Sequence, residues 1–308
     1  MDLIYQKTLS EKVKLTGVGL HSGKRSNLSI LPAEEDQGIF FKRIDLNKNN
    51  LIKASFENVS SARLCTTLEN KHGAKVSTVE HLLAALYIAG IDNALIEIDN
   101  EEVPIMDGSS KDFLKLLKQI NIVDQSKKRK YLKILDNVKL IEGKKIISIE
   151  PNNSSLEVNF QLDYENKIIG QQENTIDFQK DNLKEVSSSR TFCLFEDIEK
   201  IKKLGLAKGG SLENAIVVDN EKVLNEGGLR NEKEFVNHKI LDLAGDFLLS
   251  GYRIIGKVIC HQGGHELRNL FLRKLFDKSA SFRVLELNDF KISKKFQSKA
   301  LEKLAVSA

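Results

Sequence analysis

Tryptophan is absent from this chain of 308 residues, which also has only three prolines and three cysteines. The cysteines, Cys65, Cys193 and Cys260, are widely separated, and their odd number prevents complete pairing. Disulfide frameworks need paired cysteines, and thiolate zinc sites typically use closely spaced ones. The sequence therefore argues against both, and a reducing, cytoplasmic compartment fits three free thiols.

Long apolar stretches are missing as well. The longest, residues 82–91, has ten residues, whereas a membrane-spanning helix needs about 20. The first residues, MDLIYQKTLSEKV, carry charges where a secretory signal peptide would need an apolar segment. We therefore expect no stable insertion into a membrane, although substrates at a membrane surface are compatible with this sequence.

A large excess of one charge is also missing, because 47 basic residues accompany 43 acidic ones, for a net charge of +4. No stripe of lysine and arginine with interleaved aromatic residues is present. This composition disfavours a nucleic-acid partner but permits an anionic small substrate. With 41% hydrophobic residues, the chain has enough apolar side chains for one large or two medium domains.

The most informative stretch is residues 231–251, where apolar residues recur at helical spacing. Asn231 and Glu234 have the spacing of a capping box at the start of a helix. Gly251 is a suitable helix stop. The pattern therefore predicts one helix over this stretch.

Three polar residues share one face of this predicted helix. His238, Asp242 and Asp246 follow one another at intervals of four residues, close to one helical turn. An imidazole and a carboxylate one turn apart can bind the same metal ion, and a catalytic zinc takes three such ligands. An exposed ion pair has the same spacing, so this pattern alone leaves both interpretations open.

A second apolar segment, residues 77–91, offers a further ligand and a base. Ser77 and Glu80 again have capping-box spacing, and His81 follows directly. His81 is a candidate metal ligand, and Glu80 is either a helix cap or a catalytic base. His265 follows two glycines that permit a tight turn before a helix, and it is a candidate general acid.

The two halves of the chain repeat one order of elements. Each has strands, an apolar helix with a histidine, another strand and an amphipathic helix, and the polar stretch 121–130 separates them. We therefore expect two similar α+β domains, residues 1–126 and 127–308, with the functional site between the two histidine-bearing helices. The segments around residues 20–24 and 191–223 have no counterpart in the other half, and the tail after about residue 277 carries no motif.

Seven short motifs occur in a defined order: TGVGLHSG, STVEHLLAAL, VPIMDGSS, SRTF, VLNEGGLR, FVNHKILDLAGD and GGH. Together they resemble the UDP-3-O-acyl-N-acetylglucosamine deacetylases, zinc enzymes of lipid A biosynthesis in Gram-negative bacteria. The resemblance extends over about residues 8–275. It implies hydrolysis of the N-acetyl group of the UDP-sugar, with release of acetate and a free amine. It also implies a monomer of two domains, each a sheet with two helices, with the helices packed between the sheets.

The resemblance assigns roles to matching residues. The zinc ligands fall on His81, His238 and Asp242. The base falls on Glu80 and the general acid on His265. Ferrous iron suits the same ligands as zinc. Because the base must be deprotonated while the acid is protonated, we expect a bell-shaped dependence of activity on pH.

Other residues would complete the site by the same resemblance. Asp246 would orient His265 by a hydrogen bond and keep it cationic. Thr191 would donate to the oxyanion, and Lys239 would lie beside the reaction centre. Phe192 would line the sugar site.

The substrate's acyl chain and nucleotide raise separate expectations. By resemblance, residues 193–223 form a hydrophobic passage for the acyl chain, with matching positions at Ile198, Ala207, Ser211, Ala215 and Val217. Gln262 stands where many members have a basic residue for the diphosphate, so Lys239 and other basic groups would hold the nucleotide. Phe160 is a candidate to stack on uracil. His21 is open to two interpretations, a ligand contact or an exposed side chain.

Two other functions compete with the deacetylase. A nucleobase deaminase would need the motifs H-x-E and P-C-x-x-C, which the sequence lacks. A non-catalytic module that binds a sugar nucleotide or an acyl chain would be expected to lack Glu80 or a metal ligand, and all are present. Metal-dependent acetate release would distinguish the deacetylase from both alternatives.

Overall fold

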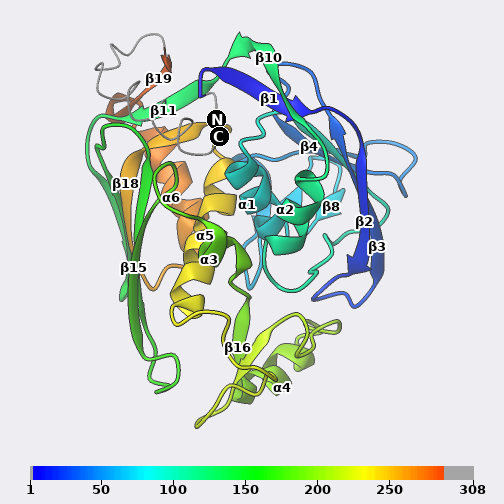
Figure 1. The fold of residues 1–308 in the computed structure, drawn as a ribbon, viewed down its shortest axis with the longest axis vertical. Helices are drawn as coiled ribbons and strands as arrows, with labels where there is room; N and C mark the ends of the chain where they lie inside the picture. Colours follow the sequence, from blue (N-terminus) through cyan, green and yellow to red (C-terminus); the bar gives the residue numbers. More distant parts are fainter. Residues whose placement is uncertain (1–2, 288–308) are drawn as a thin grey trace, which may run out of the picture.

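Most helices of this chain lie in a layer between two β-sheets, one on each side (Figure 1). The computed structural model describes residues 3–287. One sheet is built from the first half of the chain and the other from the second half. This arrangement confirms the expected α+β class with helices packed between sheets.

The sheet of the first half has five strands in the order β2-β3-β9-β4-β5. Its central strand β9 runs antiparallel to β3 and parallel to β4. Buried and half-buried positions alternate along β9 and β4, because only one face of the sheet covers the core. The strands are β2 (Val13–Val18), β3 (Arg25–Pro32), β4 (Ile39–Arg43), β5 (Leu51–Lys53) and β9 (Ala94–Ile98). A smaller sheet contains β6 (Val59–Ser61), β7 (Thr67–Glu69) and β8 (Lys75–Val76).

The sheet of the second half has seven strands around the long strand β18. β18 runs parallel to β11 and β14 and antiparallel to β13. β19 follows the last helix and pairs with β11, and no sequence pattern predicted this strand. The strands are β11 (Lys130–Ile134), β12 (Val138–Glu142), β13 (Lys145–Glu150), β14 (Leu156–Asp163), β15 (Gln171–Asp177), β18 (Arg253–His261) and β19 (Phe282–Glu286). The rest of the tail, from residue 288, lies outside the described residues.

The connection between the halves is itself a strand. β10 (Ile122–Lys128) pairs antiparallel with β1 (Tyr5–Leu9), so the first strand of the chain reaches the connection. Every residue of β10 is exposed or half-buried, which accounts for the polar composition of this stretch.

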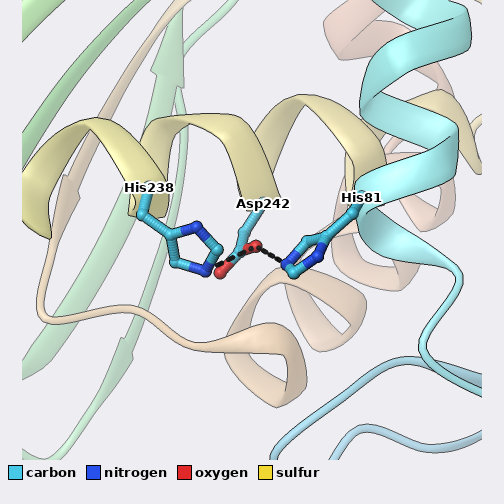
Figure 2. Close-up of side chains that lie close together, drawn as sticks. All are labelled: His81, His238 and Asp242. Carbon is cyan, nitrogen blue, oxygen red and sulfur yellow. Dashed lines mark ion pairs between the residues drawn. The ribbon is translucent and has the colours of Figure 1, made fainter. Parts of the chain in front are cut away.

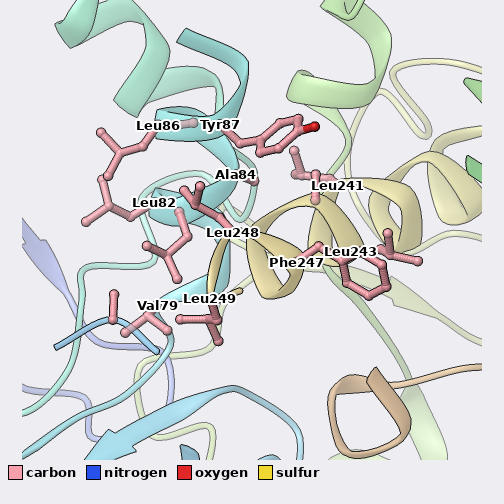
Figure 3. Close-up of a cluster of buried hydrophobic side chains, with 14 of the residues drawn as sticks. Val79, Leu82, Ala84, Leu86, Tyr87, Leu241, Leu243, Phe247, Leu248 and Leu249 are labelled. Atoms are coloured by element: carbon pink, nitrogen blue, oxygen red, sulfur yellow. The ribbon is translucent and has the colours of Figure 1, made fainter. Parts of the chain in front are cut away.

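Two helices form the centre of the molecule. α1 (Glu80–Ala89) and α5 (Glu234–Leu248) pack directly against each other, and their apolar side chains share one buried cluster (Figure 3). The remaining helices are α2 (Lys111–Leu117), α3 (Lys184–Ser188), α4 (Phe195–Lys203) and α6 (His265–Asp277), with short 3-10 turns at Phe56–Asn58 and Ser279–Ser281. α4 and the strands β16 (Phe192–Leu194) and β17 (Ile216–Val218) form a lobe that projects from the sandwich (Figure 1).

A glycine sets the closest approach of the two central helices. A methyl group at Gly245 of α5 would lie 2.1 Å from the carbonyl oxygen of Glu80, far inside van der Waals contact. Only glycine therefore lets the first turn of α1 lie directly against α5. This close contact places the residues that follow Glu80 beside the polar face of α5.

Both capping boxes expected from the sequence are wrong. α5 begins at Glu234, three residues after Asn231, and α1 begins at Glu80; neither helix has a side-chain hydrogen bond at its cap residue. The glutamates bind partners elsewhere in the fold instead. The carboxylate of Glu80 accepts a hydrogen bond from the backbone N–H of Thr66, and that of Glu234 accepts one from the side chain of Arg190. Local spacing suggested the caps, but these tertiary partners take the carboxylates.

Candidate active site

Three side chains suited to metal binding converge where α1 meets α5 (Figure 2). His81 lies in the first turn of α1, and His238 and Asp242 lie one turn apart on α5. The Nε2 atoms of His81 and His238 lie 3.4 Å and 3.3 Å from Oδ1 of Asp242. The fold thus brings together residues from both halves of the chain.

The spacing of these atoms fits a tetrahedral metal ion. Metal–ligand distances of about 2.0–2.1 Å place neighbouring ligands of a tetrahedron about 3.3 Å apart, close to the separations observed. All three side chains are buried. Among residues 3–287, Oδ1 of Asp242 and Nδ1 of His81 have no hydrogen-bond partner. A buried carboxylate oxygen without a partner is costly, and a bound cation would satisfy it.

The surroundings of His238 favour metal binding. Burial lowers the pKa of His238 to about 3, so its ring is neutral and one nitrogen is free to bind a metal ion. Nδ1 of His238 lies 3.1 Å from the carbonyl oxygen of Ser189 and donates a hydrogen bond to it when it carries the proton. This bond leaves Nε2 unprotonated and directed into the cluster.

Glu80 lies beside the cluster. Its Oε2 accepts a hydrogen bond of 3.1 Å from the backbone N–H of Thr66, and its Oε1 lies 3.7 Å from Nε2 of His265. Burial raises the pKa of Glu80 above its ordinary value. A buried carboxylate beside a metal site is suited to take a proton from a water molecule.

His265 begins α6 and is held by hydrogen bonds. Its Nδ1 lies 2.8 Å from Oδ2 of Asp246 and 3.2 Å from the hydroxyl group of Thr66. Asp246 also accepts hydrogen bonds from the hydroxyl group of Thr66 at 2.7 Å and from the side chain of Arg268 at 2.9 Å. Burial opposes protonation of His265, but the carboxylates of Asp246 and Glu80 prevail and raise its pKa above the ordinary value. The ring is therefore suited to donate a proton from Nε2.

Thr66 and Arg268 belong to this network but were not predicted from the sequence. Arg268 is fully buried and follows His265 by nearly one turn of α6, so its helical spacing was an available signal. Thr66 lies in the loop before β7, and its partner Asp246 comes 180 residues later. No local pattern links two residues at that separation.

Three more expected residues line the same cavity. The N–H of Thr191 donates to the carbonyl oxygen of Gly108 at 2.8 Å, which anchors Thr191 in the cavity wall. Nζ of Lys239 lies 3.8 Å from Oδ2 of Asp242 and 5.0 Å from the centre of the Phe192 ring. Lys239 and Phe192 therefore lie beside the three side chains suited to metal binding.

The cavity has a volume of about 850 Å³ and extends from His81, His238 and Asp242 to the lobe that contains α4. Its wall there includes the apolar side chains of Leu20, Leu194 and Ile201. The residues expected to line an acyl passage do not contribute to this wall: Ile198, Ala207, Ser211, Ala215 and Val217. They lie elsewhere in the lobe, some buried within it and others at its surface.

The residues that line the cavity also test several expected substrate contacts. Phe160 is wrong as a partner for uracil, because alternation along β14 directs its side chain into the core, where it is fully buried. Tyr164 lines the cavity instead, with its ring centre 5.9 Å from that of Phe192. Gln262 and His21 line the cavity as well, which favours a ligand contact over an exposed side chain for His21.

The thiol of Cys65 and the length of the helices complete the description of the described residues. Cys65 is buried, and this burial raises the pKa of its thiol to about 12, so it is an inert apolar side chain. Within residues 3–287, no helix combines the length and the apolar character that crossing a bilayer requires.

Comparison with known proteins agrees with this geometry. The family model for UDP-3-O-acyl N-acetylglycosamine deacetylase matches residues 6–277. The chain is 41% identical over 286 residues to the UDP-3-O-acyl-N-acetylglucosamine deacetylase of Shewanella violacea, a match that covers 92% of this chain and 93% of the relative. It is 43% identical, with the same coverage, to the protein of that name from Shewanella woodyi. The chain therefore belongs to the UDP-3-O-acyl-N-acetylglycosamine deacetylase family.

Proposed function

We propose that this protein hydrolyses the N-acetyl group of UDP-3-O-(3-hydroxyacyl)-N-acetylglucosamine to acetate and the free amine, a step of lipid A biosynthesis. One observation carries the proposal beyond family membership. The candidate base and the candidate acid, Glu80 and His265, face each other at 3.7 Å beside a cluster of three metal-binding side chains. Amide hydrolysis needs a base for the attacking water and an acid for the departing amine, and these two groups can supply both.

His81, His238 and Asp242 would hold the metal ion. We propose zinc, and ferrous iron suits the same two histidines and one aspartate. When bound, zinc polarises the acetamide carbonyl and lowers the pKa of a water molecule to about 7. Oδ1 of Asp242, which is buried and accepts no hydrogen bond from the described part of the chain, and the neutral ring of His238 support this assignment.

Glu80 would take a proton from the attacking water on its carboxylate. Deprotonated Glu80 is required at the start of the reaction, so the enzyme must work above the pKa of this group. His265 would give the proton on its Nε2 to the departing amine nitrogen. Asp246 and Arg268 would hold His265 in the orientation that presents Nε2, since Asp246 binds the other ring nitrogen.

Substrate contacts would come from the cavity wall. Thr191 would donate a hydrogen bond to the developing oxyanion, and Lys239 would supply positive charge near it. Phe192 would pack against the sugar. The apolar side chains of Leu20 and Ile201 favour the end of the cavity near α4 for the acyl chain.

The five residues that the resemblance assigned to the passage would then shape it from outside the cavity wall.

We further propose two domains, residues 1–126 and 127–308, that meet at the metal centre. We also propose that the protein is a monomer in the cytoplasm. The placement of ligands on α1 and α5, one helix from each half, supports this division. Sedimentation of the purified protein tests the monomer.

The decisive experiment measures acetate release from the UDP-sugar by the purified protein, before and after treatment with a chelator and after zinc is restored. Release that disappears with the metal and returns with zinc supports the proposal. A folded, zinc-loaded protein without release would contradict it and favour a module that only binds the sugar nucleotide or acyl chain.

A further inference from the structure

Glu234 has no part in the chemistry described above, yet its side chain is completely buried. It lies in the first turn of α5, four residues before His238. Asp242 and Asp246 continue the same interval, so Glu234 lies on the helix face that carries the active site.

The carboxylate of Glu234 binds two neighbouring segments. Its Oε1 accepts hydrogen bonds from the backbone N–H and from Nε of Arg190, at 3.1 Å and 2.8 Å. Its Oε2 accepts from Nη2 of Arg190 at 3.1 Å and from the backbone N–H of Arg230 at 2.6 Å. Because Arg190 is buried as well, water does not compete for these bonds, and the two-pronged pairing permits only one geometry.

The segment held in this way reaches the active site on both sides of Arg190. The carbonyl oxygen of Ser189 lies 3.1 Å from Nδ1 of His238, and Thr191 lines the cavity. Ser189 and Thr191 are bonded directly to Arg190, so the position of Arg190 limits where both groups can lie. Glu234 therefore controls, through one arginine, a partner of a metal-binding residue.

We propose that Glu234 is a positioning residue for the metal centre, acting through Arg190 and Ser189 to direct Nε2 of His238 toward the metal ion. This inference rests on the proposed metal site. A helix-capping role does not explain the contacts, because the donors belong to residues 190 and 230, outside α5. A purely structural ion pair would explain the burial but would not affect metal affinity.

The test compares Glu234→Gln with the matched control Glu232→Gln in the full chain. Glu232 is exposed, and its substitution changes the net charge equally. Zinc affinity is measured by competition with a chromophoric chelator, and melting of the metal-free proteins is recorded alongside. Because an NH2 group cannot accept the bonds that Oε2 accepts, we expect zinc to bind Glu234→Gln about 10- to 100-fold more weakly. We expect kcat at saturating zinc to fall while KM changes less than about twofold.

Glu234→Asp provides a second variant if Glu234→Gln does not fold. It keeps the charge but is one methylene shorter, so we expect a smaller loss of zinc affinity in the same direction. Wild-type zinc affinity in a folded position-234 variant, with only the melting temperature lowered, would overturn the inference. If wild-type protein and Glu232→Gln bind no zinc, the metal site itself is wrong and this inference fails with it.

Discussion

Asp246 and His265 are joined by a hydrogen bond of 2.8 Å between Oδ2 and Nδ1, and their side chains are only 4% and 10% exposed. The carboxylate stabilises the protonated ring, and the bond to Nδ1 leaves Nε2 facing Glu80. A proton donor needs both the charge and the orientation. This one contact can supply both, which makes it the most direct target for substitution.

Replacing Asp246 by asparagine should move the basic limb of the pH–activity profile to lower pH. The variant lacks the carboxylate that raises the pKa of His265, so the proton is lost earlier as the pH rises. We expect kcat to fall about 10²- to 10⁴-fold. Arg268 would lose a buried partner, and the free energy of unfolding should fall by about 3–5 kcal/mol. Asp277→Asn, an exposed carboxylate at the end of α6, is the control. An unmoved basic limb in folded Asp246→Asn would contradict the orienting role.

The pH profile of wild-type activity should be bell-shaped. Glu80 must be deprotonated, so activity falls as the pH drops through its pKa, which burial raises above 4.5. His265 must be protonated, so activity falls as the pH rises through its pKa, which its carboxylate neighbours raise above 6.5 despite burial. His265→Ala should lower kcat/KM and abolish the basic limb. A profile of kcat/KM from about pH 5 to pH 9 tests this. If His265→Ala retains the wild-type basic limb, His265 is not the acid.

Removal of a proposed metal ligand should abolish zinc-dependent stabilisation. Zinc at about 100 times its dissociation constant adds about 2.7 kcal/mol to the free energy of unfolding, so metal-free wild-type protein should melt at higher temperature when zinc is added. His238→Ala should lack this rise and the activity. His72→Ala is the matched control, because His72 is exposed in the turn between β7 and β8. Equal stabilisation of all three proteins by zinc would place the ion elsewhere.

Gly245→Ala should destabilise the protein, although helix propensity alone predicts the opposite. Alanine is favoured over glycine inside a helix by about 1 kcal/mol. Here the added methyl group would lie 2.1 Å from the carbonyl oxygen of Glu80, so α1 and α5 would have to separate. We expect a loss of about 1–3 kcal/mol in the free energy of unfolding and weaker zinc binding.

Gly264→Ala controls for the loss of glycine in the stability measurement, because no atom lies within 4 Å of its added methyl group and its φ is −111°. Both variants are followed by denaturant unfolding and by chelator competition for zinc. A Gly245→Ala protein as stable as wild type would show that the two helices are not held at this separation.

The placement of His238 and Asp242 on one face of α5 could be predicted because helical spacing is a local property. His238 and Asp242 lie one turn apart in any helix, and the apolar residues around them predicted that helix. The same local reasoning failed at Glu80 and Glu234. Capping-box spacing was present in both places, but Thr66 and Arg190 bind these carboxylates, and neither residue is near them in the sequence.

Local patterns in the amino-acid sequence were enough to predict the helical face with His238, Asp242 and Asp246, the α+β class and the family. Periodicity and motif order are properties of neighbouring residues, so they can be recognised without the fold. Three features became visible only in the folded protein: His81 lies 3.4 Å from Asp242, Thr66 and Arg268 complete the His265 network, and Phe160 lies in the core. These contacts depend on how closely α1 and α5 pack and on which side of a strand faces inward. Such features arise from the packing of segments far apart in the chain, which local spacing does not encode.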